Sequence, residues 1–107
     1  MELAPAQVAT LERLAQAGFG FVTIAHVERY LAVEKQGFVA LLEPAEGGFR
    51  VFGQAGLRIG EGISMLVERG AGKAFVWKQE SVAATSELLV TYEHFRAELR
   101  DLLYLKE

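Results

Sequence analysis

The chain has 107 residues, of which 51% are hydrophobic and 23% are charged, and its formal net charge is −3. This length suits one domain, and the balance of residue types is that of a globular protein rather than a disordered one. No segment is basic enough to neutralise phosphates, so the sequence disfavours nucleic acids and anionic membranes as partners.

Several features indicate a cytoplasmic protein. The chain has no cysteine, whereas secreted domains of this size often carry disulfides. The sequence Met1-Glu2-Leu3-Ala4-Pro5 has an acidic residue where a secretory signal requires basic ones. The apolar stretches are too short for a membrane span.

The first predicted element is a helix over Pro5–Ala17, because Pro5 suits a first helical position and Gly18 ends the pattern. The next segment, Phe19 to Lys35, is ambiguous between helix and strand. Its end leads into Gln36-Gly37, a pair typical of a hairpin turn. We therefore favour a strand from about Glu28 to Lys35.

Short apolar runs separated by glycine follow, and eight of the 11 glycines lie between Gly47 and Gly72. This spacing is typical of an antiparallel meander, here of four or five strands. The expected strands are Phe38–Glu43, Phe49–Gln54, Ile63–Arg69 and Lys73–Gln79, with a turn at Pro44–Gly48 and a loop from Ala55 to Gly62.

A long C-terminal helix is predicted after Thr85, a residue type suited to the N-cap. Its apolar side chains recur at steps of four and three, as one face of a helix requires; they are Leu88, Tyr92, Phe95, Leu99 and Leu102. The chain is therefore expected to be a single α+β domain over 1–107, with an antiparallel meander flanked by an N-terminal and a long C-terminal helix.

The expected strands carry apolar side chains on both faces. Phe38, Ala40 and Leu42 point to one side of their strand, and Val39 and Leu41 point to the other. Either one helix covers each face of a monomer, or both helices share one face and a second copy of the chain covers the other. The second arrangement predicts a homodimer, with these interface candidates: Phe75, Trp77, Leu99, Leu102 and Leu103.

No complete catalytic, phosphate-binding or dinucleotide-binding motif is present, so no catalytic residue and no cofactor are predicted. His94 and Glu98 lie one helical turn apart, but such a pair does not make a metal site. The most site-like segment is Gly53–Gly62, where Gln54, Arg58 and Glu61 are the candidate ligand-binding residues.

Three function classes are compatible with these features. The first is a non-catalytic module that self-associates or binds another protein. The second is a small-molecule-binding domain or minor enzyme that uses the Gly53–Gly62 segment. The third is a winged-helix DNA-binding protein, which requires a helix over Thr23–Val33 and a wing over Phe38–Phe52, although that helix offers only Arg29 as a basic group.

Overall fold

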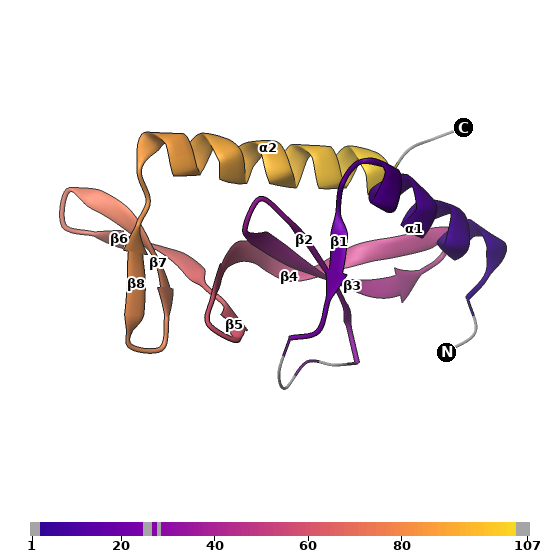
Figure 1. Ribbon diagram of the computed structural model, residues 1–107, viewed down its shortest axis with the longest axis horizontal. Coiled ribbons are helices and arrows are strands. Elements are labelled where there is room, and N and C mark those ends of the chain that lie inside the picture. Colours follow the sequence, from indigo (N-terminus) through magenta and orange to yellow (C-terminus); the bar gives the residue numbers. More distant parts are fainter. Residues whose placement is uncertain (1–2, 25–26, 28, 105–107) are drawn as a thin grey trace.

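The computed structural model describes residues 3–24, 27 and 29–104 and contains two helices and two antiparallel sheets (Figure 1). The larger sheet has the strand order β1-β2-β3-β4-β5, and the smaller one has the order β6-β7-β8. The predicted α+β class is confirmed. The elements are α1 (Pro5–Gln16), β1 (Gly20–Val22), β2 (Leu31–Lys35), β3 (Phe38–Ala45), β4 (Gly48–Ile59), β5 (Gly62–Ile63), β6 (Met65–Arg69), β7 (Gly72–Trp77), β8 (Glu80–Ala83) and α2 (Ser86–Leu103).

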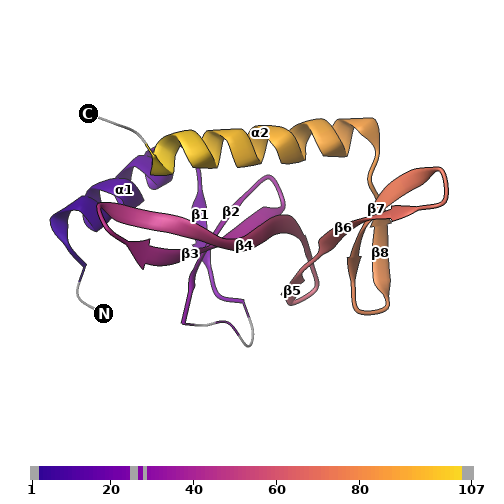
Figure 2. The same cartoon turned by 180° about the vertical axis from the view of Figure 1, so that it is seen from behind.

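Helix α2 lies along the length of the molecule and passes over both sheets, whereas α1 lies at the end opposite the smaller sheet (Figures 1 and 2). The predicted N-cap of α2 is confirmed, because Thr85 Oγ1 accepts a hydrogen bond of 3.2 Å from the Leu88 N–H. Within the described residues, neither helix is both long and apolar enough to cross a membrane.

Tight hairpins connect the strands. The Gln36-Gly37 turn is confirmed: both residues have positive φ, at 55° and 88°, as a two-residue turn of type I′ requires. The pair Lys35 and Phe38 closes this hairpin. Four more hairpins have two-residue loops, closed by Ala45 and Gly48, Ile59 and Gly62, Arg69 and Gly72, and Trp77 and Glu80.

The predicted loop from Ala55 to Gly62 is wrong, because β4 continues to Ile59. Over the interval from Phe52 to Gly56, β4 has two more residues than the paired stretch of β3, so the strand bulges and then resumes its register. Gly56, at the end of this stretch, has a packing role. A Cβ on Gly56 would collide with the carbonyl oxygen of Ser64, so close approach of two chain segments requires glycine there.

Other boundaries also differ from the expectation. The strand expected at Glu28–Lys35 begins at Leu31, and Glu28 lies outside the described residues. The strand expected at Ile63–Arg69 is split at Ser64 into β5 and β6. Strands β1 and β8 were not predicted from the sequence. The described residues between Thr23 and Val33 form no helix, so the arrangement that a winged-helix protein requires is not observed.

Both faces of β3 are covered within this chain. Phe38, Ala40 and Leu42 are fully buried against the two helices in the main hydrophobic cluster. On the other face, Val39 and Leu41 form a second cluster with Ala32 and Ile24, and partly buried side chains complete it: Val22, Val27, Tyr30 and Ile63. The described residues from Val22 to Tyr30, together with Ile63 of β5, therefore supply the cover that the two helices do not.

Aromatic side chains join the two sheets under α2. Phe75 of β7 lies with its ring centroid 5.6 Å from that of Phe38 of β3 and 5.3 Å from that of Tyr92 of α2. Phe95 of α2 extends this group, 6.1 Å from Phe38. The long helix thus packs on a core to which both sheets contribute.

Candidate functional site

The three predicted ligand-binding residues lie at different places. Gln54 is exposed in the β4 bulge and lines a groove beside α2. Arg58 lies farther along β4, with its Nη1 3.5 Å from Glu34 Oε2, and Glu61 is exposed in the hairpin loop before β5. The groove that Gln54 lines includes neither of the other two.

The predicted interface residues serve the interior of this chain. Phe75, Leu99 and Leu103 are buried in the main hydrophobic cluster. Trp77 and Leu102 are partly buried against the same cluster. A surface for another molecule must therefore be sought among other side chains.

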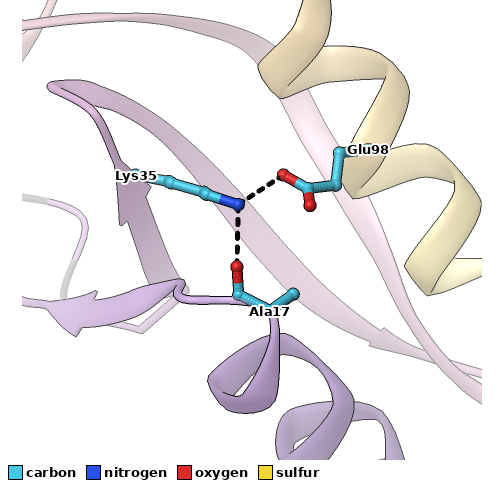
Figure 3. A network of polar contacts seen from close by, with 3 residues as sticks. All are labelled: Ala17, Lys35 and Glu98. Atoms are coloured by element: carbon cyan, nitrogen blue, oxygen red, sulfur yellow. Dashed lines mark hydrogen bonds and ion pairs between the residues drawn. The ribbon is translucent and has the colours of Figure 1, made fainter.

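One partly buried polar contact connects elements of the fold rather than forming a binding site. Lys35 Nζ of β2 donates hydrogen bonds of 2.7 Å to the carbonyl oxygen of Ala17, at the end of α1, and to Glu98 Oε1 of α2 (Figure 3). A cation at a helix C-terminus stabilises the carbonyl groups that have no partner within the helix. The interaction holds three elements together, and it engages Glu98, which was considered as a metal ligand. His94, the other residue of that pair, is exposed. The second histidine of the chain, His26, lies outside the described residues.

A groove of about 340 Å³ lies between the middle of β4 and the C-terminal half of α2. On the β4 side, β5 pairs only with Arg58 and Ile59, so in the part of the chain that the structure describes, the preceding residues of β4 have a strand neighbour on one side only. The residues that line the groove are Val51, Gly53, Gln54 and Ala55 of β4, Glu93, Arg96, Ala97, Leu99 and Arg100 of α2, and Tyr104 just after it.

A buried hydrogen bond fixes the distance between the two walls. The Tyr92 hydroxyl donates to the carbonyl oxygen of Ala55 over 2.9 Å. Burial raises the pKa of Tyr92 above its usual value because desolvation disfavours the phenolate, while the Arg96 cation acts in the opposite direction. Tyr92 therefore keeps its proton in neutral solution and remains a donor.

The charged side chains that line the groove are Arg96, Arg100 and Glu93, so the cations outnumber the carboxylate by one. Arg96 lies 3.2 Å from Glu93, and Arg100 lies 3.7 Å from Asp101, each measured between side-chain nitrogen and oxygen. All four side chains are more than half exposed, so these ion pairs contribute little to stability. Both guanidinium groups can exchange these contacts for an anion in the groove.

Arg96 and Arg100 were not predicted from the sequence as binding residues. A signal was present, since residues four apart lie on the same side of a helix and the helix itself was correctly predicted. The sequence did not indicate that this side of α2 faces the bulge of β4, because that contact joins residues about 40 positions apart.

Among the described residues, no three potential metal-ligating side chains gather at one place. The groove is therefore the candidate site, and among the described residues its chemistry is that of a binding surface with a strand edge, two arginines and the carboxylate of Glu93. A comparison with known protein families, characterised proteins and solved structures found no match for this chain.

Proposed function

We propose that the protein is a non-catalytic interaction module whose groove between β4 and α2 binds an extended, acidic segment of another protein. The observation that carries this proposal is the open edge of β4 beside Arg96 and Arg100. An extended peptide can add to such an edge through main-chain hydrogen bonds. The two guanidinium groups would then select carboxylate side chains at alternate positions of the peptide.

The size and exposure of the groove favour a peptide over a small molecule. A volume of about 340 Å³ is at the low end for small-ligand pockets, which bury most of the surface of their ligand. Here the charged side chains of the wall are more than half exposed. A peptide tolerates such a site, because the rest of its chain lies along the protein surface.

The test is a fluorescence-anisotropy titration with a labelled peptide of alternating valine and glutamate. We expect the double variant Arg96→Gln/Arg100→Gln to weaken binding by more than about tenfold, since each charged contact contributes on the order of 1 kcal/mol or more. Arg69→Gln is the matched control, because Arg69 is exposed on the β6–β7 hairpin away from the groove. It should leave the affinity unchanged.

A peptide of alternating valine and lysine provides the second control. Equal binding of the acidic and basic peptides would contradict the proposal, as would undiminished binding of the acidic peptide to the double variant. Absence of binding to the unaltered protein would also contradict it.

Self-association is a second candidate, favoured by the outer face of the smaller sheet. Met65 of β6 is 64% exposed. Val67 and Val76, which lie on the same face as Met65, are partly exposed and belong to neither hydrophobic cluster. Such a face can be covered by the same face of a second copy around a two-fold axis.

We also propose a cytoplasmic location for either form of the module. The absence of cysteine supports this proposal.

A further inference from the structure

A second, smaller cavity lies at the end of the larger sheet, between the sheet and α1, where Leu11 of the helix lines it. Its volume is about 150 Å³. Among the described residues that line it, one is the charged Arg29 and the others are apolar: Leu3, Leu11, Leu31, Leu42, Pro44 and Phe49.

The floor and the rim of this cavity differ in exposure. Leu42 and Phe49 of the floor are 0% and 4% exposed, whereas Leu3 is 37% exposed and Pro44 is also exposed. The cavity is therefore a pit in the main core that opens toward solvent past α1. Apolar cavities of this volume hold a group of about the size of a benzene ring.

Arg29 lies at the rim as part of a stack. Its guanidinium carbon is 4.9 Å from the centroid of the Tyr30 ring. That ring stacks on Phe52 with centroids 4.3 Å apart and an angle of 13° between the planes. Arg29 therefore contributes to the lining of the cavity and also contacts the Tyr30 ring, and it is the one charged side chain among the described lining residues.

We propose that this cavity binds small carboxylates with an apolar tail of about benzene size. The tail occupies the space above Leu42 and Phe49, and the carboxylate pairs with the guanidinium of Arg29. A buried apolar floor, combined with Arg29 as the one charged side chain among the described lining residues, favours a molecule that is apolar at one end and anionic at the other. This site is distinct from the groove beside α2 and does not depend on its function.

The probe is phenylacetate, titrated into the uniformly ¹⁵N-labelled full chain and followed by amide chemical shifts. We expect the shifts to concentrate at Leu31, Leu42 and Phe49, with a dissociation constant on the order of 1 mM for so small a ligand. The neutral analogue 2-phenylethanol, which has a similar shape, should bind roughly tenfold more weakly because it lacks the charge.

The variant Arg29→Gln separates the carboxylate contact from the apolar contact. Arg29 is exposed, so its replacement leaves the fold intact. It should weaken phenylacetate binding by roughly tenfold while changing 2-phenylethanol binding by less than about twofold. Arg69→Gln should change neither.

Three results would overturn the inference: no localised shifts with phenylacetate, equal affinity for phenylacetate and 2-phenylethanol, or an unchanged phenylacetate affinity in Arg29→Gln. The acidic-peptide titration tests the groove beside α2 in a separate experiment. A failure at one site is thereby distinguishable from a failure at the other.

Discussion

Trp77 of β7 lies against the backbone of β5, a strand of the other sheet. A Cβ added to Gly62 of β5 would collide with atoms of the Trp77 indole, so the ring covers the space that any side chain at position 62 would fill. The sequence suggested an interface role for Trp77. In the structure, a glycine makes room for the ring beside the core.

Gly62→Ala is expected to destabilise the protein by about 1–3 kcal/mol, because the indole must move to admit a methyl group. Trp77 is the only tryptophan, so its fluorescence emission should shift to longer wavelength in the variant as the ring gains contact with water. Denaturant unfolding measures the free energy. Gly72→Ala is the matched control, since a Cβ there has no heavy atom within 4 Å; equal destabilisation by both changes would refute this explanation.

At the scale of elements, α2 depends on its first turn as well as on its packed face. The Thr85 hydroxyl satisfies the Leu88 N–H, one of the four N–H groups that a helix start leaves without a partner. The first turn of α2 also lies next to the smaller sheet, because one residue, Ala84, separates β8 from Thr85. A change that destabilises this turn is therefore expected to disturb the packing of the smaller sheet against α2.

Thr85→Ala is expected to lower the free energy of unfolding by about 1 kcal/mol. Thr85→Ser keeps the accepting oxygen and should retain most of the stability. Urea denaturation followed by circular dichroism compares the three proteins. A loss in the serine variant as large as that in the alanine variant would show that the hydroxyl has no capping role.

For the whole molecule, the main question is which apolar surface is left for another copy. The sequence argument for a homodimer was based on two apolar faces of the central sheet, and the chain covers both faces of β3 itself. The homodimer stays a prediction, but its support is now the outer face of the smaller sheet around Met65.

Self-association through this face predicts a solution mass of twice 11.8 kDa by light scattering at micromolar concentration. Met65→Glu should return the mass to that of one chain, because a buried carboxylate at the centre of an apolar interface is costly. Val90→Glu is the control, since Val90 is 55% exposed on α2 and does not belong to the sheet face that carries Met65. A mass of one chain for the unaltered protein at every concentration would exclude this dimer.

Elements with a strong local pattern were predictable. Pro5 starts α1, Thr85 caps α2, and Gln36-Gly37 forms the hairpin turn, because periodicity, capping and turn geometry depend on residues close in sequence. The stretch from Gly53 to Gly62 has no such pattern. Its glycines resembled a loop, although at Gly56 and Gly62 they permit close approach of other segments.

The sequence by itself determined the fold class, the two helices and most of the strands, since these follow from short-range spacing of apolar and turn residues. Only the tertiary structure decided that β4 continues through its bulge and that Arg96 and Arg100 line one groove with Gln54. It also decided that the outer face of β3 is covered by side chains that include Val22, Ile24, Val27 and Tyr30. Each of these outcomes depends on pairing or packing between residues far apart in the chain. Such contacts leave no period in the sequence that encodes them.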